Sequence, residues 1–365
     1  MIVIITHGHF DHVMGLPYLL RDFPNIEVAM TLPTFDILGW LMNDSRRLQK
    51  DGFVDMDIKE LEERVIFLED NSSFNFGRFN IKTFSAGHIL GSISLLVSVG
   101  GKKIFFSGDI SLRDQRIMKC SSVLDEKNLE VDSVITETTN ADKTFTETRL
   151  EVGRRLAESV IRILDNGGRY ILTAPAIGRS QELWSELEWR GITKRYNVYL
   201  LGGAKKIAKI YHDRGFLHSY GSTNVGELLD SKKPWVAIAP SGMLMGGSSL
   251  ALTKIFIDNP KCAIGFSCWQ DPYGAGTALL NTKIGDQIIF GGSPKSGGGY
   301  VKSVKAKIES FSFSTHPTGA EIMYLADKLK AKKIMMVHGD RAAMDAFQKR
   351  DLRITRPLIG ESYEM

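Results

Sequence analysis

The sequence has few cysteines, no long apolar segment and little excess charge. Only three of its 365 residues are cysteine, and Cys120, Cys262 and Cys268 show neither zinc-ligand spacing nor a disulfide framework. The longest apolar runs, such as residues 93–99, are far shorter than the roughly 20 residues that cross a bilayer. The N-terminus lacks a basic stretch ahead of an apolar core. We therefore expect no membrane span and a reducing, cytoplasmic location.

The charge balance does not identify a partner. Lys and Arg number 46 and Asp and Glu 42, so the formal net charge of +4 is too small to indicate a polyanionic partner. The chain also lacks an aromatic-rich RNP motif and an evident KH loop, so no nucleotide preference can be inferred. A content of 43% hydrophobic and 24% charged residues is typical of globular proteins, and the length predicts about two domains.

The first third of the chain alternates β-branched runs with amphipathic stretches, which predicts an α/β protein. Gly100 and Gly101 separate two apolar runs and indicate a hairpin, so the first sheet should contain antiparallel pairs. The expected elements are a strand at 2–6, a helix at 33–49, hairpin strands at 94–99 and 103–107, and a strand at 131–137.

From about residue 146 strand and helix signals alternate regularly. Thr146 is the expected N-cap of a helix over 147–165 that ends at Gly167 and Gly168. This alternation favours a doubly wound, mostly parallel sheet. The glycine-rich stretch 291–299 is expected to be a mobile loop. Further expected elements are strands at 169–174, 198–201, 235–239 and 262–266 and helices at 180–189, 204–214 and 248–257.

The strongest chemical signal is the segment Thr6-His7-Gly8-His9-Phe10-Asp11-His12, which directly follows an expected strand. A tight loop leaving a sheet can turn His7 and His9 toward one metal ion and Asp11 and His12 toward a neighbouring ion. Imidazole and carboxylate ligands without thiolates suit zinc, with manganese or iron as alternatives. The other interpretation is a solvated polar loop, in which so dense a set of ligands is uncommon.

Three more candidates, His88, Asp109 and His338, each lie at the end of an expected strand and beside a glycine. Each glycine would relieve crowding near a metal. Taken singly, any of the three is as consistent with a structural residue as with a ligand. Their joint occurrence indicates a metal site. His212 and His218 fall in an expected helix and its following turn, and we interpret them as structural or surface residues.

These motifs resemble the metal-binding motifs of the metallo-β-lactamase fold, and further landmarks resemble the β-CASP nucleases. Glu137 in Thr136-Glu137-Thr138 is similar to that family's acidic motif. His316 in Phe313-Ser314-Thr315-His316 is similar to its second added motif, and His338 is similar to its third. A histidine at the third motif is typical of the RNA-cutting members, whereas the DNA-repair members have valine.

Other segments extend the resemblance over nearly the whole chain. Residues 86–92 resemble the nuclease subunit of the cleavage and polyadenylation specificity factor and its prokaryotic homologues. The insertion before His316 carries two family-like stretches, 174–181 and 241–244. Within them, Arg179 is either a phosphate contact or a structural residue, and Gly242 belongs either to an anion-binding turn or to a close packing contact. Pro317 departs from the small residue that is usual in the family.

The resemblance implies a metallo-β-lactamase αββα sandwich with an inserted, doubly wound α/β β-CASP domain. The implied domains are a first part over 1–141, the insertion over 142–308 and a C-terminal part over 309–365. In the family several strands precede the first metal motif, whereas here that motif begins at His7, so the N-terminal strands of the first sheet are expected to be missing. A fragment, a start placed too late and an open sheet edge are the explanations left open.

The resemblance also implies two Zn²⁺ ions, with Mn²⁺ or Fe as alternatives, and a separate acid–base pair. His316 would donate a proton to the leaving oxygen, and Glu137 would hydrogen-bond to His316. The implied ligands of the first ion are His7, His9, His88 and Asp109, and those of the second are Asp11, His12, Asp109 and His338. The implied catalytic residues are Asp11, His316 and Glu137.

The implied activity is that of a two-metal endoribonuclease that hydrolyses RNA phosphodiester bonds in 3′-end processing or turnover. Its implied partners are single-stranded RNA and either a second copy of the chain or an RNA-processing complex. Two alternatives stay open. A small-molecule hydrolase of the same fold would not be expected to carry the insertion or the His316 motif, and a non-catalytic scaffold subunit would be expected to lose metal ligands.

Overall fold

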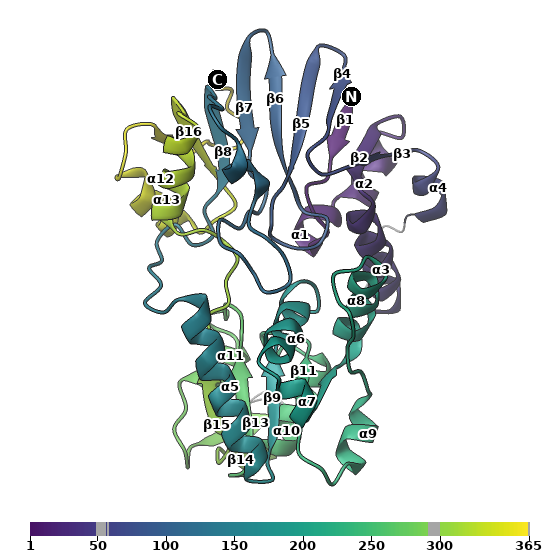
Figure 1. Cartoon of the computed structure of the whole chain (residues 1–365), viewed down its shortest axis with the longest axis vertical. Helices are drawn as coiled ribbons and strands as arrows, with labels where there is room; N and C mark the ends of the chain where they lie inside the picture. Colours follow the sequence, from purple (N-terminus) through teal and green to yellow (C-terminus); the bar gives the residue numbers. More distant parts are fainter. Residues whose placement is uncertain (49–55, 57, 291–299, 364–365) are drawn as a thin grey trace. The chain divides into compact units, whose positions relative to one another are not determined.

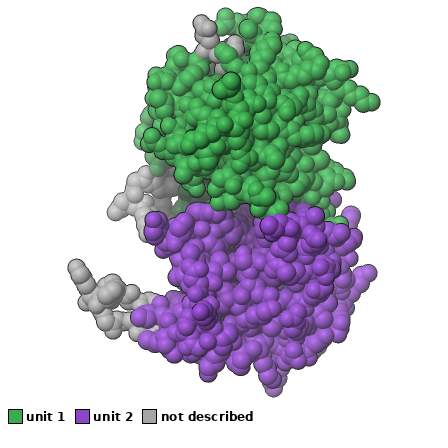
Figure 2. Space-filling view, turned by 90° about the vertical axis from the view of Figure 1, so that its left-hand side faces the viewer, with its two compact units in different colours: residues 1–145, 315–365 green, residues 146–314 purple. Residues whose placement is uncertain are grey.

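The computed structural model describes residues 1–48, 56, 58–290 and 300–363. It divides into two compact units (Figure 2): residues 1–145 with 315–365 form unit 1, and residues 146–314 form unit 2. The unit boundaries differ slightly from the expected domain boundaries at 142 and 308, because the strand Lys307–Ser310 pairs within the sheet of unit 2. Within the described residues, no helix combines the length and apolar character of a membrane span.

Unit 1 contains two sheets (Figure 1). The smaller has three parallel strands in the order β1-β2-β3, and the larger has seven in the order β17-β16-β8-β7-β6-β5-β4. The hairpin predicted at Gly100 and Gly101 is confirmed, because β6 and β7 pair antiparallel with Val99 opposite Lys102. The strands are β1 (Ile2–Ile4), β2 (Glu27–Thr31), β3 (Val65–Leu68), β4 (Ser73–Phe76), β5 (Phe79–Ser85), β6 (Ile93–Val99), β7 (Lys102–Phe106), β8 (Ser133–Glu137), β16 (Lys333–Val337) and β17 (Ile354–Thr355).

An apolar core lies on each face of the seven-stranded sheet. Between the two sheets, Ala29 of β2 packs in one cluster with Ile93 of β6. On the opposite face, Phe105 of β7 packs in a second cluster with Leu325 and Phe347, which lie on two helices. The layers therefore run helix, sheet, sheet, helix, as the sequence predicts (Figure 1). The helices of unit 1 are α1 (Phe10–Val13), α2 (Leu16–Asp22), α3 (Leu32–Leu48), α4 (Ile58–Glu62), the 3-10 turn η1 (Ser122–Asp125), α12 (Gly319–Lys328) and α13 (Arg341–Gln348).

Unit 2 is built on a five-stranded, all-parallel sheet in the order β10-β11-β9-β12-β15. The chain leaves the central strand β9 toward one edge and later returns to the other edge, so the doubly wound topology is confirmed. Residues 291–299, which we expected to be a mobile loop, lie outside the described residues. The strands are β9 (Arg169–Thr173), β10 (Asn197–Leu200), β11 (Trp235–Ala239), β12 (Ala263–Phe266), β15 (Lys307–Ser310) and the separate hairpin β13 (Gln287–Phe290) and β14 (Tyr300–Ser303).

The helices of unit 2 follow the predicted alternation, with one error at the start. Thr148, not Thr146, caps the first helix: its hydroxyl accepts from Glu151 N, and the Glu151 carboxylate accepts from Thr148 N at 2.7 Å. The prediction of Thr146 was wrong, because the glutamate of a capping box lies three residues after Thr148, whereas Arg149 lies three residues after Thr146. The helices are α5 (Arg149–Asp165), α6 (Arg179–Trp189), α7 (Ile192–Arg195), α8 (Gly202–Asp213), α9 (Val225–Asp230), α10 (Gly247–Phe256) and α11 (Ala275–Leu280).

Candidate metal centre

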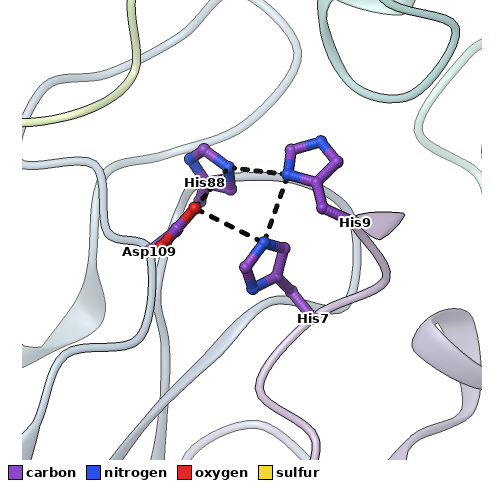
Figure 3. A group of neighbouring side chains, drawn as sticks. All are labelled: His7, His9, His88 and Asp109. Atoms are coloured by element: carbon purple, nitrogen blue, oxygen red, sulfur yellow. Dashed lines mark hydrogen bonds and ion pairs between the residues drawn. The ribbon is translucent and has the colours of Figure 1, made fainter. Parts of the chain in front are cut away.

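Four of the predicted ligands form one group, which we call site one. His88 follows β5, Asp109 follows β7, and His7 and His9 lie between β1 and α1. Their side chains point toward one another (Figure 3), and one ligand atom of each lies within 4.8 Å of the others. His9 Nδ1 is 3.2 Å from the Nε2 atoms of both His7 and His88. His7 Nε2 is also 3.6 Å from Asp109 Oδ2.

Asp11, His12 and His338 form a second group, site two, by the same criterion. Asp11 and His12 lie in the short helix α1, not in a loop as expected, and His338 follows β16. His338 Nε2 is 3.1 Å from Asp11 Oδ2, and this hydrogen bond, partly offset by burial, raises the pKa of His338 to about 9. Asp109 Oδ1 lies 3.6 Å from His12 Nε2 and 3.7 Å from His338 Nδ1, so Asp109 stands between the two sites.

The electrostatics of the centre suit bound cations. His12 Nε2 and Asp109 Oδ1 are buried, and neither has a hydrogen-bond partner within the described part of the chain. Burial, and then the charge of Glu137, raises the pKa of Asp109 to about 6. Burial, and then the charges of His9 and His12, holds the pKa of His7 well below its usual value. Divalent ions would neutralise this unfavourable arrangement, and imidazole and carboxylate donors fit zinc.

Glu137 and His316 form a charged pair beside site one. Glu137 ends β8 and is buried, and its Oε2 accepts from His316 Nδ1 at 2.7 Å, while its Oε1 accepts from Ile110 N at 2.9 Å. Burial favours the neutral form of both side chains, but their mutual attraction outweighs it and lowers the pKa of Glu137 while raising that of His316. The ring of His316 lies 4.7 Å from that of His88, measured between centroids.

Two residues that the sequence analysis missed hold the loop of His316. The carbonyl of His316 accepts from Arg113 Nη2 and from Asn140 Nδ2, each at 3.2 Å. Arg113 Nε also lies 3.0 Å from Glu321 Oε1, and Glu321 caps helix α12 together with Thr318. Isolated polar residues in loops give no sequence signal, so neither Arg113 nor Asn140 could have been identified from its own position.

The remaining sequence candidates belong to unit 2, whereas both ligand groups belong to unit 1. His212 and His218 line a surface pocket of unit 2, and His212 Nδ1 is 3.6 Å from Asp213 Oδ1. Arg179 is partly buried in unit 2 and donates to the carbonyl of Phe313. Loss of hydration, and then the charge of Arg149, lowers its pKa to about 9, so it stays cationic at neutral pH. These contacts favour the structural interpretation of Arg179.

Glycines near the centre serve close packing with loops. A Cβ on Gly87, whose φ is +70°, would lie 2.6 Å from the carbonyl oxygen of Lys119. A Cβ on Gly339 would lie 2.5 Å from Thr138 Oγ1. The neighbours are thus a backbone and a hydroxyl, which alone disfavour any side chain at both positions, and relief of crowding near a metal stays a prediction. Gly242 of unit 2 is similar, because its Cβ would lie 2.5 Å from Cys268 Sγ.

Comparisons with protein families match two parts of the chain. Residues 1–121 match the metallo-beta-lactamase superfamily, and residues 302–351 match the Zn-dependent metallo-hydrolase RNA specificity domain. The first range contains all of site one as well as Asp11 and His12. The second contains His316 and His338.

Curated relatives match almost the whole chain at low identity. The cleavage and polyadenylation specificity factor subunit 3-II of Arabidopsis thaliana is 25% identical over 94% of this chain and 58% of its own length. Endoribonuclease YSH1 of Gibberella zeae is 25% identical over 94% of this chain and 47% of its own. Integrator complex subunit 11 of Gallus gallus is 25% identical over 95% of this chain and 60% of its own length. The chain thus spans about half the length of these relatives.

Among solved structures, the chain is similar to a protein of unknown function from Enterococcus faecalis V583. The TM-score is 0.56 at 12% sequence identity, and the match covers 93% of this chain and 75% of that one. At this identity the likeness supports the fold alone.

Proposed function

Because this chain belongs to the β-CASP family of metallo-β-lactamase-fold proteins, we propose that it is a metal-dependent endoribonuclease that hydrolyses phosphodiester bonds in single-stranded RNA. The observation that carries the proposal is the position of the Glu137–His316 pair. One ligand-type atom from each of Asp109, Glu137 and His316 lies within 4.8 Å of the others. A proton donor therefore lies next to Asp109, the carboxylate between the two sites, where it could protonate the leaving oxygen of a phosphodiester.

The centre would hold two zinc ions through sites one and two, with Asp109 between them. Bound ions would supply Lewis acidity to the phosphate and to the attacking water. His7, His88 and Asp109 are buried and would fix the inner ion, whereas Asp11 and His338 are exposed to solvent. An exposed site beside a buried one would let a phosphate approach without disturbing the inner ligands.

His316 would protonate the oxygen that leaves. The hydrogen bond from its Nδ1 to Glu137 fixes the ring orientation and favours the imidazolium, leaving Nε2–H for the substrate. Glu137 acts through His316 and does not need to touch the RNA. Asp11, which we also predicted to be catalytic, has its Oδ2 3.1 Å from His338 Nε2 at site two, and both atoms would hold the second ion.

Substrate and partners are inferred from the relatives. The match of residues 302–351 to an RNA specificity domain supports RNA as substrate, and the names of the relatives support a role in RNA 3′-end processing or turnover within a complex. The alternative partner is a second copy of the chain, which would form a homodimer. A measurement of the molecular mass in solution tests for this dimer. All three cysteines are free thiols, which supports the proposed cytoplasmic location; cell fractionation tests that location.

The first experiment is cleavage of end-labelled single-stranded RNA, with DNA of the same sequence as a control, by the wild type and by Asp109→Ala. Zinc is measured on both proteins by elemental analysis. We expect internal cuts in RNA that are lost together with zinc in Asp109→Ala, because Asp109 is shared by both sites. Asp142→Ala is the matched control, since Asp142 is an exposed carboxylate of the same unit that pairs with Lys143.

Two other outcomes would contradict the proposal. Zinc-loaded protein that leaves RNA intact would favour the small-molecule hydrolase. Protein without zinc would favour the scaffold subunit.

A further inference from the structure

In the centre, each of three histidines has the hydroxyl of a different threonine beside its Nδ1 atom. In each case the hydroxyl contacts Nδ1, while Nε2 is the atom nearest to another ligand. The pairs are Thr315 Oγ1 with His88 Nδ1 at 2.9 Å, Thr139 Oγ1 with His338 Nδ1 at 2.9 Å, and Thr6 Oγ1 with His7 Nδ1 at 3.2 Å. Their repetition suggests a common role in fixing which ring nitrogen carries the proton.

The contacts of Thr139 define the direction of its hydrogen bond. A hydroxyl has one proton to donate and lone pairs that accept. The hydroxyl of Thr139 lies 3.3 Å from the carbonyl of His338 and also hydrogen-bonds to the Glu137 carboxylate, and both partners can only accept. Its single proton is therefore directed to these acceptors, and its lone pair faces His338 Nδ1 at 2.9 Å. Nδ1 must then carry the ring proton. The Nε2 atom of His338, which lies 3.1 Å from Asp11 Oδ2, is left as the ligand atom.

Thr315 makes the equivalent contact at site one in a more buried setting. Thr315 is 6% exposed and His88 is 3% exposed, so bulk water does not compete for this hydrogen bond. His88 Nε2 lies 3.2 Å from His9 Nδ1 and 3.7 Å from Asp109 Oδ2, inside the ligand group. Thr315 also directly precedes His316, so one short segment positions a ligand and the proposed acid.

We propose that Thr315 and Thr139 are positioning residues that hold His88 and His338 with the proton on Nδ1 and the lone pair on Nε2, one threonine for each metal ion. The inference rests on the proposed metal centre but not on its activity toward RNA. Partners of this kind orient a histidine ligand and set its tautomer. A hydroxyl does so without adding charge, which leaves Asp109 and Asp11 as the carboxylates of the two sites.

The first test measures zinc affinity by competition with a chelator. Thr315→Val and Thr139→Val keep the side-chain shape and remove the hydroxyl. Each should lower the affinity for one of the two zinc ions by about ten- to hundredfold. Thr315→Ser and Thr139→Ser keep the hydroxyl and should restore binding. Thr83→Val is the control, because Thr83 is buried in the same unit but its hydroxyl donates to the Glu69 carbonyl at 2.6 Å.

The second test needs no variant and therefore does not depend on folding of the valine proteins. Long-range ¹H–¹⁵N spectra of the zinc-loaded wild type should show Nδ1 protonated and Nε2 bound to zinc in His88 and His338. Protonated Nε2 in either ring, or unchanged zinc affinity in both valine variants, would overturn the inference. If the wild type binds no zinc, both the inference about the threonines and the proposed metal centre are wrong. Zinc binding with the expected spectra but no RNA cleavage would contradict the proposed function alone.

Discussion

His316 belongs to neither site one nor site two, and it groups instead with Asp109 and Glu137. We therefore expect its chemistry to be separable from metal binding at the two sites. Its Nδ1 is committed to Glu137, and its carbonyl is held by Arg113 and Asn140. The side chain and the backbone of His316 are therefore both held in place. A substitution at this residue should change proton transfer without changing the metal content.

We predict that His316→Ala retains both zinc ions and lowers the rate of RNA cleavage by about 10²- to 10⁴-fold, because a positioned general acid contributes about that much. Single-turnover cleavage and zinc analysis of the same sample measure the two effects. Glu137→Gln should lower the rate less, since the proton donor itself remains. His212→Ala, at an exposed histidine of unit 2, is the control. Full activity of His316→Ala would rule out the assigned role.

The difference between predicted and missed residues has a physical basis. His88, Asp109 and His338 were predictable because an apolar strand delivers each of them to a loop, and this pattern is local in the sequence. Arg113 and Asn140 contact a backbone carbonyl that lies 203 and 176 residues further along the chain. Any residue type has such a carbonyl, so no pattern of side chains reveals the contact.

At the scale of elements, the helices α5 and α12 begin with the same capping box but have different surroundings. In α5, Thr148 and Glu151 form the reciprocal hydrogen bonds of the capping box at an exposed helix start. In α12, Glu321 also contacts Arg113, which holds the carbonyl of His316. The second cap is therefore connected to the proposed acid and the first is not.

This difference predicts distinct effects for two equivalent substitutions. Thr148→Ala and Thr318→Ala should each lower the free energy of unfolding by about 1 kcal/mol through loss of an N-cap. Only Thr318→Ala should also lower the rate of RNA cleavage, because Glu321 and Arg113 lose their fixed positions. Denaturant melts and initial cleavage rates of the two variants provide the comparison. Equal cleavage rates would show that the α12 cap does not position His316.

At the centre, the largest difference from the predicted secondary structure is α1, where a loop was expected. Residues 10–13 form one helical turn, and His9 is its N-cap with φ −74° and ψ 152°. The density of ligands suggested a loop, since four residues are too few for an apolar helical period to be recognised. The change matters because one helical turn, not alternation along an extended chain, directs Asp11 and His12 to site two.

At the scale of the whole molecule, every proposed ligand belongs to unit 1, although this unit is formed by two separate segments of the chain. The doubly wound sheet of unit 2 was predictable from the alternation of strand and helix signals, whereas the sandwich of unit 1 was implied by the resemblance of its metal motifs. The boundaries between the units were less predictable, since strand β15 leads directly into the segment that returns to unit 1.

Metal removal should therefore destabilise one unit and leave the other unchanged. A ligand at about 100 times its dissociation constant stabilises the folded state by about 2.7 kcal/mol, and unit 2 provides none of the ligands. Hydrogen exchange with and without chelator should show faster exchange in residues 105–112 and 334–340 and no change in residues 169–174. Faster exchange in residues 169–174 as well would mean that the stabilities of the two units are coupled.

The two segments of unit 1 also set an order for biosynthesis. Every ligand of site one lies within the first 109 residues, whereas site two needs His338, which follows Asp11 by 327 residues. At about 5–20 residues per second, a ribosome needs roughly 15 to 65 s to add that length. A nascent chain can thus complete the site for one ion while the second is still being translated. The supply of zinc during translation would then decide how many new chains leave the ribosome ready for activity.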